Sequence, residues 1–241
     1  MAGAIRVGIG GWTFAPWRGT FYPDDLKQKD ELAWASRHLT AIEINGTYYS
    51  GFKPATFAGW AAQAPAGFVF AVKGSRFCAN RRVLAEGAES VRRFFAQGIA
   101  ELGEKLGPIL WQFMATKRFD RDDFAGFLDL LPTARRHVVE VRHDSFKDAR
   151  FVDLCRERGI AICLADHDTY PMLDEATADF VYARLMRGHD ETPTCYPPAE
   201  IAAWAERFKA VAPRDVFAFF IGGGKVRAPT GAMALMEKVG V

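Results

Sequence analysis

The amino-acid sequence predicts an α/β protein that folds as a single closed (β/α)8 barrel of the TIM type, with residues 1–241 forming one domain. Eight short runs of β-branched and aromatic residues alternate with segments whose apolar residues recur at helical spacing. The length of 241 residues suits such barrels, which typically have about 250 residues. No Pro/Gly/Ser-rich linker divides the chain. An open doubly wound sheet accommodates the same order of elements, but eight repeats with no segment left over favour closure.

The expected strands are mostly continuous apolar runs, as is typical of parallel strands that are covered on both faces. They cover residues 5–10, 41–45, 68–73, 108–113, 138–142, 160–166, 180–185 and 216–221. A helical pattern follows each strand, and right-handed crossovers through these helices make the sheet parallel. The expected helices cover residues 24–38, 54–64, 82–106, 122–131, 151–158, 174–178, 198–210 and 231–238.

Local signals justify several of these helices. Asp24 or Asp25 is placed to cap the first helix, and Asp120 is placed to cap the fourth. Apolar residues from Val91 to Leu106 recur on one face of the third helix. The sixth helix, over residues 174–178, is the weakest because it spans only a turn or two.

Composition and charge narrow the class of function. Thirty-one Lys and Arg against 29 Asp and Glu leave a formal charge of +2, so the sequence gives no reason to expect indiscriminate polyanion binding. No apolar run approaches the ~18 residues of a membrane helix, and the N-terminus lacks the layout of a signal peptide. We therefore expect a cytoplasmic protein with no membrane partner. The four cysteines form no C-x-x-C pair, which favours buried thiols in a reducing compartment.

Polar residues gather at the C-terminal ends of the expected strands, where such barrels carry their active sites. Polar groups in buried strands are costly unless they are paired or functional. Glu43 and Asn45 are two residues apart and therefore share a face of their strand, as do Glu140 and Arg142. The candidate substrate-binding residues are Trp12, Asn45, Tyr49, Gln112, Arg142, Arg184, Gly222, Gly223 and Lys225.

Two interpretations of these residues remain open, and they are compatible. In the functional one, Glu43, Glu140 and Lys73 are the candidate catalytic residues, with either glutamate as the acid or base. Lys73 also joins Arg142 and Arg184 in a clamp for an anion. In the structural one, the three cations neutralise the two glutamates in an ion-pair network that closes the top of the barrel.

The glycine run before Lys225 lies where barrels often bind phosphate through backbone N–H groups. With Arg142 and Arg184 it predicts a site for a small anionic or phosphorylated molecule, because these strand ends lie within one arc of the ring. On this hypothesis Arg184→Ala abolishes anion binding and lowers the melting temperature by only a few degrees. Three glycines also make an ordinary flexible loop, and the run lacks the spacing of a P-loop.

Aromatic residues crowd the first two loops at the same end of the barrel. Trp12 and Tyr49 are the candidates for stacking on a ligand, because rings among basic groups suit a nucleotide or a single-stranded nucleic acid. The alternative function is therefore a binding module for nucleotides or single-stranded nucleic acid. A barrel with only a structural or partner-binding role is a third possibility. The sequence carries no signal for an oligomeric state.

Metal ligands are sparse at the strand ends. His143 and His167 follow strands five and six, near Glu140, Asp166 and Asp168, but no metal-binding spacing joins them. We expect neither a metal nor another cofactor.

Motifs at the strand ends resemble one known family. Gly10-Gly11-Trp12, followed by Trp17, Gly19 and Phe21-Tyr22-Pro23, is similar to the opening of the YecE-like family, catalogued as domain of unknown function 72. The resemblance covers almost the whole chain and implies a (β/α)8 barrel with no established reaction. The motifs that continue it, in order, are Glu43-Ile44-Asn45-Gly46-Thr47-Tyr48-Tyr49, Phe70-Ala71-Val72-Lys73, Leu110-Trp111-Gln112-Phe113, Glu140-Val141-Arg142-His143-Asp144-Ser145-Phe146 and Arg184.

The chain departs from the family pattern after three strands, and the resemblance therefore implies a divergent member. Arg76-Phe77-Cys78-Ala79-Asn80 stands where the family usually has a Thr-His pair. Arg184-Leu185-Met186-Arg187-Gly188 and Phe220-Ile221-Gly222-Gly223 replace an Arg-Leu-His-Gly run and a Phe-Asn-Asn run. These changes weaken a metal site and shift the polar groups toward arginine and glycine.

Overall fold

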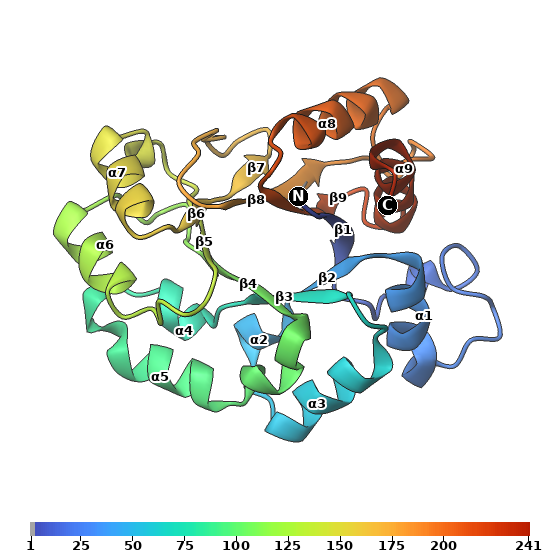
Figure 1. The fold of residues 1–241 in the computed structure, drawn as a ribbon, viewed down its shortest axis with the longest axis horizontal. Helices are drawn as coiled ribbons and strands as arrows, with labels where there is room; N and C mark the ends of the chain where they lie inside the picture. The colour runs from blue at the N-terminus through green and yellow to red at the C-terminus, as the bar shows by residue number, and fades with distance from the viewer. Residues whose placement is uncertain (1–2) are drawn as a thin grey trace.

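The computed structural model describes residues 3–241, in which parallel strands form a ring with helices around its outside (Figure 1). Residues 1–2 of the predicted domain lie outside the described residues. The strands are β1 Ile5–Gly10, β2 Ala41–Ile44, β3 Val69–Lys73, β4 Leu106–Gln112, β5 His137–Glu140, β6 Ala161–Ile162, β7 Leu164–Asp166, β8 Phe180–Arg187 and β9 Asp215–Gly223. The α-helices are α1 Glu31–His38, α2 Gly46–Tyr49, α3 Pro54–Gln63, α4 Arg76–Ala79, α5 Ala88–Ala96, α6 Arg121–Leu128, α7 Ala149–Glu157, α8 Pro198–Ala210 and α9 Ala228–Val239.

The ring has nine strands over residues 3–241 where the sequence predicts eight, because the sixth expected strand is divided. Only Cys163 separates β6 from β7; β6 pairs with β5, and β7 pairs with β8. The backbone N–H of Cys163 donates to the carbonyl of Val139 at 2.9 Å. Residues 161–166 thus occupy the sixth position and complete the ring. The predicted TIM-type (β/α)8 barrel is confirmed, with this one difference in strand count.

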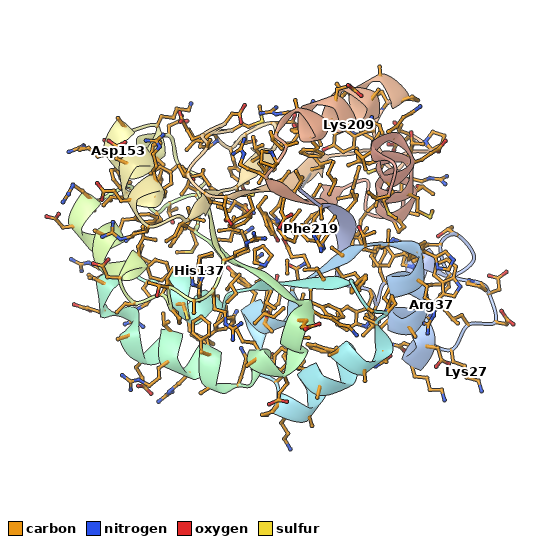
Figure 2. The ribbon with its side chains drawn as sticks, in the orientation of Figure 1. Lys27, Arg37, His137, Asp153, Lys209 and Phe219 are labelled. Carbon is orange, nitrogen blue, oxygen red and sulfur yellow. The ribbon has the colours of Figure 1, made fainter. Side chains whose placement is uncertain are left out.

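Successive side chains of each strand point to opposite faces of the sheet, which produces two apolar layers. Ala41 packs inside the barrel, whereas Ile42 and Ile44 pack in the layer between the strands and the helices. Glu43 therefore points into the ring. Phe219 lies inside the ring in Figure 2, while the side chains of Asp153 and Lys209 lie at its periphery.

Three predicted helices differ from the structure. The helix expected over residues 82–106 is broken, because α5 ends at Ala96 and a 3-10 helix begins at Ile99. Gly98 lies between them with a φ of 98°, a left-handed conformation that ends helices and favours glycine. The first helix begins at Glu31, after a 3-10 turn, and residues 174–178 form no helix.

Two further expectations about the helices are confirmed. Asp120 caps α6, where its side chain accepts hydrogen bonds from the backbone N–H groups of Asp122 and Asp123. Helix α8 spans the predicted residues 198–210. Within the described part of the chain, no helix combines the length and hydropathy needed to cross a membrane.

Candidate functional site

Five predicted residues meet at the C-terminal ends of the strands, where they form a buried charged cluster. Glu43 lies on β2, Lys73 ends β3, Gln112 ends β4, Glu140 ends β5 and Arg184 lies on β8. Each has an exposed fraction of 7% or less, and both glutamates are fully buried. Because buried charges are costly unless they are paired, the partners of each group decide what it can do.

Arg184 joins the two glutamates across the barrel. Its Nε and Nη2 donate to the two carboxylate oxygens of Glu43 at 3.2 and 3.1 Å. Its Nη1 donates to Oε2 of Glu140 at 2.5 Å. The hydroxyl of Tyr182, two residues earlier on the same strand, donates to Glu43 at 2.6 Å. The guanidinium is therefore occupied by carboxylates, which leaves it unsuited to clamp an external anion.

Glu140 is the most heavily bonded carboxylate of the cluster. It accepts two hydrogen bonds from Nε2 of Gln112, at 2.9 and 3.0 Å, and one from Nε of Arg142 at 2.8 Å. Burial alone raises the pKa of Glu140, but Arg184 and Arg142 outweigh it and lower the pKa to about 2. Glu140 is thus an ionised counter-ion, and it holds no proton to donate near neutral pH.

Lys73 is the exception in the cluster, because no carboxylate is bonded to its amine among residues 3–241. Its Nζ lies 4.4 Å from the centre of the Tyr48 ring, and the side chain is 6% exposed. Burial lowers the pKa of Lys73, Arg184 lowers it further, and the two glutamates raise it only in part, so that it falls to about 8. Near neutral pH the amine is a buried cation that can also lose its proton.

The predicted residues from the first two loops border a separate part of the mouth. Trp12 and Asn45 line a cavity of about 360 Å³. Trp12 packs edge-on against Trp60, with ring centres 5.1 Å apart. Tyr49 is 60% exposed and contacts Tyr48. Tyr48 in turn covers Lys73, so this loop connects the aromatic rim with the charged cluster.

The glycine run is explained by close packing of the backbone. A Cβ atom on Gly223 would lie 2.6 Å from the carbonyl oxygen of Gly188, and one on Gly224 would lie 2.6 Å from the backbone nitrogen of His189. Lys225 places its Nζ 4.1 Å from the centre of the Phe14 ring. Arg142 is bonded to Glu140 and Arg184 to both Glu43 and Glu140, so an anion at the predicted site would have to compete with these carboxylates.

The potential metal ligands are dispersed. Asp166 bonds to Arg187 at 2.6 Å and to the Tyr196 hydroxyl at 2.8 Å. Nδ1 of His143 instead contacts the hydroxyl of Ser145 at 2.9 Å. Over residues 3–241 no three His, Cys, Asp or Glu side chains lie close enough together to hold a metal ion.

Sequence reasoning missed two tyrosines that shape the cluster. Tyr182 shares a strand face with Arg184, and this spacing of two was a readable signal of its contact with Glu43. Tyr170 stacks under Arg142, with its ring centre 4.6 Å from the guanidinium carbon. No pattern in the sequence indicates that second contact, because Tyr170 lies in a loop without regular structure.

The fold and the cluster define a (β/α)8-barrel protein with a buried ionic network at its C-terminal mouth. The family model described as "Protein of unknown function DUF72" matches residues 6–241, so the chain belongs to this family. The YecE-like resemblance is thereby confirmed, since it names the same family. No curated protein matches the chain.

Solved structures share the fold at low sequence identity. A DUF72 family protein of Enterococcus faecalis V583 matches with a TM-score of 0.76 and 18% identity, covering 99% of this chain and 98% of that one. A DUF72 family protein of Thermotoga maritima MSB8 matches with a TM-score of 0.74 and 22% identity, covering 98% of each chain. A xylose isomerase-like TIM barrel/4-hydroxyphenylpyruvate dioxygenase fusion protein matches with a TM-score of 0.57 and 15% identity, covering 99% of this chain and 43% of that one.

Proposed function

We propose that the protein is an enzyme acting on a small anionic or phosphorylated molecule at the C-terminal mouth of the barrel, with Lys73 as the residue that meets the substrate. One observation carries this proposal: the charged cluster and the adjacent Arg142 together hold three cations and two carboxylates, and Lys73 is the cation to which no carboxylate is bonded within residues 3–241. A buried cation without a partner costs stability, and groups that break the packing rules in this way tend to mark functional sites.

The two glutamates, expected from the sequence to act as acid or base, have a supporting role in this proposal. Glu43 and Glu140 hold Arg184 in place, and the resulting network joins β2, β5 and β8 beneath the mouth. Lys73 supplies positive charge to the substrate and, with a pKa of about 8, can accept or return a proton. A substrate anion would stabilise the charged amine and thereby raise its pKa.

Calorimetric titration of the wild-type protein with phosphate, sugar phosphates and mononucleotides tests this function. We expect binding at pH 7 that weakens as the pH rises above about 8, because the amine then loses its charge. An adenine mononucleotide is the best probe, because its phosphate is almost fully ionised above pH 7, with a second pKa of about 6, and its base does not titrate in this range, so its affinity reports on the protein. Affinity that stays constant from pH 7 to pH 10 would exclude Lys73 as the anion-binding group.

The nucleic-acid alternative is favoured by a different observation. The rings of Tyr49 and Phe77 are 60% and 61% exposed at the rim of the mouth, and the guanidinium of Arg76 lies 5.2 Å from the centre of the Phe77 ring. Exposed rings beside arginine are suited to stacking on unpaired bases. Fluorescence anisotropy with a labelled single-stranded oligonucleotide tests it, with Tyr49→Ala and Phe77→Ala each expected to weaken binding.

A further inference from the structure

A second cavity, distinct from the charged cluster, lies among the loops and helices that follow β2 and β3. Its volume is about 360 Å³, within the range of about 300–1,000 Å³ for small-molecule sites. Helix α2 and the residues just after it supply Thr47 and Ser50, while Ser75, Arg81 and Ser90 come from the segment after β3. Among residues 3–241, no acidic side chain lines the cavity.

Arg81 gives this cavity a positive charge that no described residue neutralises. None of the ion pairs within residues 3–241 involves Arg81, and its buried Nε has no hydrogen-bond partner there. Its Nη1 donates to the hydroxyl of Ser90 at 3.3 Å. Arg93 also lines the cavity, but Glu89 bonds to it at 2.8 Å. Arg81 is therefore the cation available to a ligand.

The hydroxyl groups around the cavity add unused donors. Ser90 accepts from Arg81, and Ser75 accepts from the backbone N–H of Phe77 at 3.3 Å. Neither hydroxyl donates to another group within the described part of the chain, so each proton is available to a ligand. A guanidinium fork with nearby hydroxyl donors matches the several acceptor oxygens of a phosphate group. The exposed ring of Phe77 forms a wall for an organic substituent.

We propose that this cavity is a binding site for the phosphate group of a small phosphorylated molecule, held by Arg81 with Ser75 and Ser90. The site is separate from Lys73, although the two are neighbours in the fold. Thr47 lines the cavity, and its hydroxyl donates to the backbone carbonyl of Lys73 at 2.6 Å. The amine of Lys73 is not among the lining groups.

Calorimetric titration of inorganic phosphate into the Lys73→Met variant tests this site without any contribution from the mouth. We expect one phosphate per chain. Adding Arg81→Met should weaken the affinity by about tenfold or more, the loss typical of removing a charge-assisted hydrogen bond from a ligand. Adding Arg81→Lys, which keeps the charge but removes the fork, should give an intermediate loss.

Arg82→Met is the matched control, because Arg82 is the adjacent residue, is exposed and does not line the cavity. The protein that carries both Lys73→Met and Arg82→Met should bind phosphate with the same affinity as the Lys73→Met parent. Circular dichroism melting verifies that each variant is folded. If Arg81→Met fails to fold, the phosphate affinity of Arg81→Lys is compared with that of the control instead. Absence of phosphate binding to the parent, or equal affinities for the Arg81 and Arg82 variants, would overturn the proposal. Either result leaves the proposed function of Lys73 unaffected, since the parent lacks that amine.

Discussion

Replacing Arg184 with methionine is expected to lower the free energy of unfolding by about 3–5 kcal/mol, the usual cost of removing one partner from a buried ion pair. Arg184 is the shared counter-ion of Glu43 and Glu140, which are both fully buried. Without it, two carboxylates remain in the barrel with their charge only partly balanced. This expectation replaces the loss of a few degrees predicted from the sequence for Arg184→Ala.

Thermal unfolding measures the effect, and a loss of this size should lower the melting temperature by roughly 10 °C in a domain of this length. Tyr182→Phe is the matched control, because it removes a single hydrogen bond from Glu43 and should cost only about 1–3 kcal/mol. Combining Arg184→Met with Glu43→Gln and Glu140→Gln should recover part of the loss, since it also removes the unbalanced charges. A melting temperature of Arg184→Met within a degree or two of wild type would contradict a structural role for the network.

Replacing Lys73 with methionine is expected to have opposite effects on ligand binding and on stability. Binding of an anion at the mouth should be lost, because the amine is the one cation of the cluster without a carboxylate partner among the described residues. Stability should rise. The pKa of Lys73 falls from 10.5 in an ordinary environment to about 8, so below pH 8 the folded protein carries a poorly solvated charge. Removing that charge should add on the order of 1–3 kcal/mol near neutral pH.

The lowered pKa of Lys73 also predicts how the stability of the protein depends on pH. Between about pH 8 and 10.5 the unfolded chain binds more protons at Lys73 than the folded protein does, so the wild-type protein should gain stability as the pH rises through this range. Lys73→Met should lack that gain. Lys53→Met serves as the control, because Lys53 is an exposed lysine between α2 and α3 and should alter neither property. A Lys73→Met protein that is less stable than wild type at pH 7 would indicate a structural role for the amine.

The barrel was predictable because its strands are defined by local sequence. Alternation of apolar strands with amphipathic helices identified every position of the ring, including the one that Cys163 divides. The long helix expected over residues 82–106 was wrong because apolar spacing continues through Gly98, whose left-handed backbone breaks the helix. Periodicity indicates which residues are buried, but it does not reveal a change of backbone direction.

The members of the charged cluster were predictable, but their pairing was not. Polar residues at the C-terminal ends of parallel strands converge in any such barrel, which placed Glu43, Glu140 and Arg184 together. Which cation neutralises which carboxylate depends on side-chain reach across the ring. Arg184 bonds to both glutamates, and Lys73 turns toward Tyr48 instead. The glycine run has a second explanation, because the backbone of Gly223 and Gly224 closely approaches Gly188 and His189.

The most direct test of the account is a nuclear magnetic resonance titration of the lysine side chains, labelled at the ε-carbon, in the Arg81→Met variant with and without sulfate. Sulfate keeps a constant charge over this range, and the substitution removes the second proposed anion site. One lysine should titrate near pH 8, its signal should vanish in a Lys73→Met derivative, and sulfate should raise its pKa. If Lys73 titrates with the other lysines near its ordinary value of 10.5, or if sulfate leaves its pKa unchanged, the assignment of the mouth as an anion site through Lys73 is contradicted.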